Sequence, residues 1–205
     1  TTTPDNLTSY VRTPVTVTVN GGPRPLWIYA DAEQSPITGG IACALCFVDS
    51  SASAVDGDTA TASRLVLPVG VATSLGQRLY FPGDYQAGDH IALDLEVPNQ
   101  LLSGQLLGGI NIQTFKDSVA NNDQTFLNGA LVNVQLLGIG TGNTNKFRAI
   151  IPVTKDFDAV QVNISSLLAG LGSLKIYEAV AYAPVDVDPD TVVVTSGAAA
   201  TLNAS

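Results

Sequence analysis

The chain has 205 residues, of which 45% are hydrophobic and 13% are charged, and its 9 Lys and Arg against 18 Asp and Glu give a net charge of −9. This length can bury one large core, and so few charges are not typical of a disordered chain or of long solvated helices. The acidic balance excludes a protein that follows a nucleic-acid backbone through a basic surface, and it disfavours an anionic membrane surface.

Strand signals dominate the chain from its beginning. Residues 13–20 alternate Val and Thr and end at the Gly-Gly-Pro cluster of 21–23, which is typical of a turn. In 90–97 the apolar residues fall on every second position, which predicts one buried face. Further runs of this kind lie at 25–30, 63–70, 77–81, 109–115, 131–137, 146–153, 159–164, 173–182 and 191–195. About ten such runs, separated by Gly, Pro, Asn and Asp, predict an all-β fold, a jelly-roll-like β-sandwich with extra N- and C-terminal strands.

The two ends of the chain differ from its middle. We expect N-terminal strands or an extension over 1–39, the sandwich over 40–184, and a linker with a terminal strand over 185–205. The tail looks like one strand, a turn and the start of another, and an isolated strand pair is only marginally stable in water. The tail must therefore pair with its own sandwich, with a following module or with a neighbouring subunit by strand addition. The residues expected to take part in strand exchange are Val192, Val193, Val194 and Leu202.

Several features bear on where the protein works. No run of 18 apolar residues occurs, so no membrane span is expected. The chain begins at Thr1 and contains no Met, as expected of a processed protein or of a segment of a longer one. Its many Thr, Val, Ala and Gly residues, with little Lys and Glu, favour a secreted β protein, located outside the cell or at its surface.

Residues for hydrolytic chemistry are scarce. The single His, His90, lies within a predicted strand, and no Gly-x-Ser-x-Gly, His-Glu-x-x-His or phosphate-loop motif occurs. A pair of carboxylates from two strands stays open, but nothing in the sequence singles out such a pair. We therefore expect a protein that is not an enzyme.

The only two cysteines form a Cys-x-x-Cys motif at Cys43 and Cys46. A redox motif of this kind opens a helix in an alternating β-α pattern, whereas the surroundings here are rich in Gly and strands. A zinc site needs more ligands than one such pair supplies. We expect a local disulfide that closes a loop, with two buried thiols as the alternative.

The segment Ala54-Val-Asp-Gly-Asp-Thr-Ala-Thr61 is the sharpest local signal. Asp56, Asp58 and Thr61 place oxygen atoms around Gly57, which permits a tight turn. Oxygen ligands on a curling loop suit Ca²⁺. The alternative is an ordinary Asp-Gly turn between two strands.

This segment, together with the closing Leu-x-x-Tyr-Glu-x-x-x-Tyr of 174–182, resembles the discoidin-like, galactose-binding-like jelly roll. In that family the first loop holds a structural Ca²⁺. The resemblance implies these ligands: the side chains of Asp56 and Thr61, the carbonyls of Ser53 and Asp58, and Glu178 from the closing strand. The chain departs from the family where Ala62-Ser63 replaces an aromatic residue after the Thr. It also lacks the family's Trp and Arg ligand platform, because Trp27, the only Trp, lies in the predicted N-terminal extension; sugar binding then rests on fold analogy.

Over residues 40–183 the order of motifs also resembles modules of large secreted Bacteroidetes surface proteins of the adhesin type. In those organisms Asp-Ser/Thr-apolar triplets carry O-linked glycans, and Asn-x-Ser/Thr is the acceptor for N-linked ones. The resemblance and the sequons imply glycosylation at Thr59, Ser118, Thr191 and Asn6.

Two functions follow from these observations. The first is a structural or adhesive subunit of an extracellular fibre, which assembles with copies of itself or with adjacent modules through strand addition. The second is a carbohydrate-binding module of a secreted protein, with glycans as ligands, which predicts exposed aromatic residues at one end of the sandwich. An enzyme would instead need converging carboxylates or a metal in a deep pocket.

Overall fold

The computed structural model describes residues 27–40, 43, 45–68, 73–97, 102–137, 145–165, 172–184, 187–188 and 203–204. The chain divides into two units. One consists of Pro25–Pro184 and holds both large sheets. The other combines Thr1–Arg24 with Val185–Ser205. Its described strands, β14 (Val187–Asp188) and β15 (Asn203–Ala204), pair with each other in antiparallel fashion.

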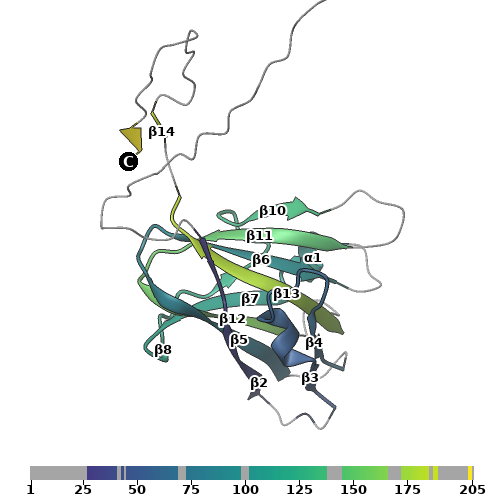
Figure 1. Cartoon of the computed structure of the whole chain (residues 1–205). Coiled ribbons are helices and arrows are strands. Elements are labelled where there is room, and N and C mark those ends of the chain that lie inside the picture. The colour runs from purple at the N-terminus through teal and green to yellow at the C-terminus, as the bar shows by residue number, and fades with distance from the viewer. Residues whose placement is uncertain are drawn as a thin grey trace, which may run out of the picture. The chain divides into compact units, whose positions relative to one another are not determined.

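The unit Pro25–Pro184 is a sandwich of two antiparallel sheets, which lie as two layers in Figure 1. The seven-stranded sheet has the order β10 (Asn133–Leu136), β11 (Lys146–Pro152), β6 (His90–Glu96), β13 (Ser173–Tyr182), β4 (Ser63–Val66) and β3 (Phe47–Asp49), and β1 (Trp27–Tyr29) pairs with β13. The six-stranded sheet has the order β2 (Ala32–Gly40), β5 (Thr73–Tyr85), β12 (Phe157–Ser165), β7 (Ile110–Lys116) and β8 (Val119–Ala120), and β9 (Thr125–Phe126) pairs with β7. Two single turns of helix, η1 (Ser51–Ala54) and α1 (Gly104–Leu107), lie in the connections. This architecture confirms the predicted all-β sandwich.

The core lies between the sheets and is built by alternation along the strands. Ile91, Leu93 and Leu95 of β6 are fully buried, as the spacing of apolar residues in 90–97 predicts. In β12 of the facing sheet, Val160 and Val162 take the same role. The residues between them therefore point to the two outer faces of the sandwich, where the polar side chains gather.

A buried polar network holds the loop after β3 against the second sheet. Gln77 of β5 is fully buried and accepts a hydrogen bond from Ser63 of β4. Its Nε2 donates to the carbonyl of Ser51 in η1 at 2.8 Å and to Glu33 of β2 at 3.2 Å. Because a buried amide is costly to leave without partners, these bonds fix η1 relative to both sheets.

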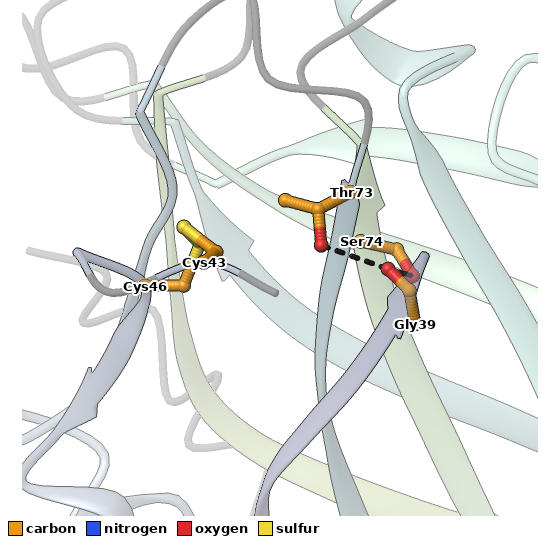
Figure 2. Close-up of a disulfide and its surroundings, with 5 residues drawn as sticks. All are labelled: Gly39, Cys43, Cys46, Thr73 and Ser74. Carbon is orange, nitrogen blue, oxygen red and sulfur yellow. Dashed lines mark hydrogen bonds between the residues drawn. A yellow bond between two sulfur atoms is a disulfide. The ribbon is translucent and has the colours of Figure 1, made fainter. Parts of the chain in front are cut away.

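The two cysteines are joined as a disulfide in the connection between β2 and β3 (Figure 2). Cys46 packs against the core, whereas Leu45, which lies between the two cysteines in the sequence, is 71% exposed. Figure 2 also shows Thr73 at the start of β5, whose hydroxyl donates to the Gly39 carbonyl at the end of β2, at 2.8 Å.

The predicted division of the chain at residues 39 and 40 differs from the observed units. β1 lies before residue 40 and β2 ends at residue 40, and both strands are hydrogen-bonded to other strands of the sandwich. The unit therefore begins at Pro25. The strands expected over 13–20 and 191–195 fall outside the described residues.

Candidate functional site: an aromatic groove on the seven-stranded sheet

Aromatic side chains gather on the outer face of the seven-stranded sheet. Trp27 and Tyr29 of β1 are 65% and 49% exposed, while Ile28 between them packs against the core. The two rings therefore project to the same, outer side of the sheet. Trp27 lies in register opposite Tyr182 of β13. Tyr182 in turn stacks on His90 of β6, with ring centroids 5.6 Å apart, so aromatic side chains extend across β1, β13 and β6.

Trp27, Tyr29 and Tyr182 line a groove of about 320 Å³, which we call the aromatic groove. Its lining also includes Val180 and Ile150, which supply apolar surface, and Gln135 and Arg148, which supply polar groups. Gln135 of β10 and Arg148 of β11 lie opposite each other in register. The volume is at the lower end of the range of small-molecule sites, roughly 300–1,000 Å³.

The orientation of Arg148 is fixed by a carboxylate from the neighbouring strand. Its Nε donates to Asp94 Oδ1 at 2.6 Å, and its Nη2 donates to Asp94 Oδ2 at 2.9 Å, which is a bidentate pair. The same Nη2 lies 3.6 Å from Oε1 of Glu178. The three residues are cross-strand neighbours on β11, β6 and β13. Within the described part of the chain, Nη1 of Arg148 has no protein partner and can donate to a ligand in the groove.

Burial and neighbouring charges shift the pKa values within the cross-strand row of Arg148, Asp94 and Glu178. Burial raises the pKa of Glu178 above its ordinary value of 4.5; the nearby charge of Asp94 raises it further and that of Arg148 lowers it. The hydrogen bond with Asp94 raises the pKa of Arg148, so the guanidinium stays charged. Neither carboxylate is among the residues that line the groove. The groove thus presents flat rings beside fixed hydrogen-bonding groups, which suits a ligand with an apolar face and hydroxyl groups at its edge.

The predicted calcium loop is closed by protein hydrogen bonds. Asp56 Oδ1 accepts the Asp58 N–H at 2.9 Å, and Asp56 Oδ2 accepts the Thr61 hydroxyl at 2.7 Å. These bonds, the first more than the second, lower the pKa of Asp56. The ammonium group of Lys146 donates to the Thr59 carbonyl at 3.1 Å, so a positive charge already lies against this loop. The arrangement is that of a hydrogen-bonded Asp-Gly turn.

The two remaining predicted ligands, Ser53 and Glu178, lie on other elements, η1 and β13. Ser53 lies in η1, where its N–H donates to the Ser50 carbonyl at 2.9 Å. Glu178 lies 3.6 Å from the Arg148 guanidinium on the outer face of the sheet. No group of three or more His, Cys, Asp and Glu side chains that could hold a metal occurs among the described residues. The predicted set also includes two backbone carbonyls and the Thr61 hydroxyl, and calcium binding stays a prediction of the resemblance.

The other predicted sites are placed only in part. Thr59 and Ser118 are exposed on turns, which leaves them accessible, and their glycosylation stays a prediction. Thr191 and Asn6 lie outside the described residues. The same holds for the strand-exchange residues, which are Val192, Val193, Val194 and Leu202, so assembly by strand addition also stays a prediction. No helix in the described ranges is long and apolar enough to cross a bilayer.

The aromatic groove is not predicted by the sequence. Trp27 falls in the segment that is expected to form an N-terminal extension, and Arg148 and Gln135 belong to no motif. The one available signal was the Trp-x-Tyr spacing of 27–29, which puts two aromatic rings on one face of a strand. That signal could not show which strand lies beside it.

Comparisons with known proteins give matches of structure only. No family model matches the chain, and no curated protein matches it either. Among solved structures, the family 32 carbohydrate-binding module of Clostridium perfringens NanJ, in complex with galactose, has 13% identity and a TM-score of 0.41, covering 76% of this chain and 98% of its own. The module CBM32-3 from a family 31 glycoside hydrolase of the same organism has 18% identity and a TM-score of 0.40, covering 78% and 92%. The xylan-binding module CBM86 of Roseburia intestinalis has 9% identity and a TM-score of 0.36, covering 74% and 94%.

The likeness concerns the fold class, which in this chain is established by its own strand pairing.

Proposed function

We propose that this chain is a carbohydrate-binding module whose ligand is a neutral glycan held in the aromatic groove. The observation that carries the proposal is that three aromatic rings, those of Trp27, Tyr29 and Tyr182, line one groove. The same groove is lined by the amide of Gln135 and by Arg148, whose guanidinium is held in place by Asp94. A pyranose ring has an apolar face of C–H groups and a rim of hydroxyls. The apolar face packs on an aromatic ring, and the hydroxyls pair with planar amide and guanidinium groups.

The charge around the groove favours a neutral glycan over an acidic one. Arg148 is already neutralised by the bidentate contact with Asp94, and Glu178 adds a second acidic group beside it. A carboxylated or sulfated sugar would have to compete with Asp94 for the guanidinium. Neutral hydroxyls need only the donors that Asp94 leaves unused.

The same acidic residues argue for binding rather than hydrolysis. Asp94 and Glu178 both face the Arg148 guanidinium, which forms a bidentate pair with Asp94 and lies 3.6 Å from Oε1 of Glu178. The two carboxyl groups of a glycosidase stand about 5 Å or more apart, with the scissile bond between them. Neither of the two residues lines the groove. The disulfide between Cys43 and Cys46 supports the expected extracellular location, since such bonds persist in oxidising compartments.

The test is to replace Trp27 and measure glycan binding. Trp27→Ala should weaken the binding of neutral oligosaccharides by at least about tenfold, because truncating a central aromatic residue usually removes much of the binding energy. A panel of cello-, xylo- and galacto-oligosaccharides identifies the ligand, and titration calorimetry measures its affinity. The matched control is Phe47→Ala on β3, another exposed aromatic residue that does not line the groove. Equal affinities of the wild type and Trp27→Ala would refute the proposal.

A further inference from the structure

The outer face of the six-stranded sheet carries a second groove, of about 280 Å³, on the opposite side of the sandwich from the aromatic groove. We call it the amide groove, because its side chains are mainly those of Asn and Gln. The lining residues that carry the argument are Asn111, Gln113, Gln124, Phe126, Gln161 and Asn163.

Strand register gathers four of these amides into a block. Gln161 and Asn163 project outward from β12, since Val160, Val162 and Ile164 on either side of them are fully buried. On the neighbouring strand β7, Gln113 lies opposite Gln161, and Asn111 lies opposite Asn163. The outer face therefore presents four amide side chains from two adjacent strands.

A chain of hydrogen bonds orients part of this block. Arg78 of β5 donates through Nη2 and Nε to Oε1 of Gln161, at 2.8 and 3.2 Å. Gln161 Nε2 then donates to Oδ1 of Asn163 at 2.8 Å. Gly76 makes room for this arrangement, because a Cβ atom there would lie 2.2 Å from Asn163 Oδ1. The Nδ2 group of Asn163 is left as a donor without a protein partner in the described ranges.

The Gln113 side chain is a second amide that a ligand in the groove can reach. The residue is only 9% exposed, yet the described residues offer its amide no hydrogen bond. Because Gln113 lines the groove, its amide is available to a ligand there, both as a donor and as an acceptor. Asn111 beside it is likewise without a side-chain partner in the described part of the fold.

The chemistry of the groove defines the ligand class. Among the described residues that line it none is charged, in a chain with a net charge of −9. Each amide both donates and accepts, as hydroxyl groups do. Phe126, 47% exposed and in register beside Asn111, adds one aromatic face at the rim. An extended peptide would add to a sheet edge through its backbone instead, and a nucleic acid would need cationic side chains.

We propose that the amide groove is a second saccharide site, so that one chain binds two glycan strands on opposite faces of the sandwich. The inference goes beyond the proposed function and stands on different residues from the aromatic groove. Two sites on one rigid body would let the protein cross-link polysaccharide chains and gain avidity on a surface that displays many of them.

Nuclear magnetic resonance separates the two sites in one titration. The indole N–H of Trp27, the only Trp, reports on the aromatic groove, and the side-chain amides of Asn111, Gln113 and Asn163 report on the amide groove. The probes are cellohexaose, xylohexaose and maltohexaose at millimolar concentration. We expect the side-chain amide signals of Trp27→Ala to shift on sugar addition as they do in the wild type. In Phe126→Ala, the affinity measured from the amide signals should fall about tenfold, while the indole signal still shifts as in the wild type.

A second variant distinguishes a loss of binding from a loss of folding. Gln113→Leu keeps the size of the buried side chain and removes its amide, so it should lower affinity at the amide groove without lowering the melting temperature. If none of the three sugars shifts the amide signals in Trp27→Ala, the second site is refuted. An indole shift in the wild type would then still support the proposed function. Amide shifts without any indole shift would refute the proposed function and leave the second site standing.

Discussion

Arg148 supplies the charged side chain of the aromatic groove, and Glu178 beside it is a carboxyl group whose ionised form is disfavoured. Asp94 alone supplies the bidentate contact that orients the guanidinium. Glu178 lies 3.6 Å from the same guanidinium, largely shielded from solvent and next to the charge of Asp94. Its ionised form is therefore disfavoured in the folded protein, and a neutral side chain of the same shape would fit better at neutral pH.

Glu178→Gln should stabilise the protein at neutral pH, and the gain should depend on pH. The pKa of Glu178 is raised in the folded state, so its contribution to stability is fully present below the ordinary value of 4.5 and is lost as the pH rises through the folded value. The variant carries no such penalty. Urea unfolding of both proteins at a series of pH values should give equal free energies below pH 4.5, with the variant more stable above the folded pKa. The control is Asp31→Asn, an exposed carboxylate; a wild type that is as stable as Glu178→Gln at every pH contradicts the argument.

The Asp56 loop gives a second prediction at this scale. Asp56 closes the loop through Asp58 and Thr61, with the Lys146 ammonium against the Thr59 carbonyl. On this arrangement Asp56→Ala should lower the melting temperature by the same amount in calcium and in EDTA, because the lost partners are protein groups. The measurement is differential scanning calorimetry in both buffers. A wild type that melts at a lower temperature in EDTA, with Asp56→Ala indifferent to the chelator, would instead establish the calcium site implied by the resemblance.

At the scale of single elements, the sequence predicts faces well and neighbours poorly. The period-two alternation of 90–97 correctly assigns the buried face of β6. Alternation says nothing about which strands lie side by side, so it could not bring β1 to β13 or collect Asp94, Arg148 and Glu178 into one row. The disulfide could be expected from the spacing of its cysteines, because a pair that close in sequence needs no knowledge of the fold.

A β-bulge in β13 shows why the site itself was beyond prediction. Leu174 and Ile176 face the core, and strict alternation would turn Glu178 inward as well. The pairing with β6 shifts between Ile176 and Glu178, which adds Tyr177 to the strand. The extra residue turns Glu178 outward, next to Asp94, and returns Ala179 to the core. A bulge of this kind follows from tertiary packing, and a one-residue shift exchanges the two faces of a strand.

On the scale of the whole molecule, net charge decides which glycans can approach. The chain carries a net charge of −9. The one cationic side chain among the described residues that line either groove is Arg148 in the aromatic groove, which is already paired with Asp94. A neutral sugar experiences little of this field, whereas an acidic sugar is repelled over a distance that salt shortens to about 10 Å at 0.1 M.

Affinity for a neutral oligosaccharide should therefore change less than about twofold between about 50 mM and about 500 mM NaCl. An acidic oligosaccharide of equal length, such as an oligogalacturonide, should bind more weakly at low salt and gain affinity as salt is added. Isothermal titration at both salt concentrations measures this, and acidic-sugar binding that salt weakens would show instead that Arg148 recognises an anion.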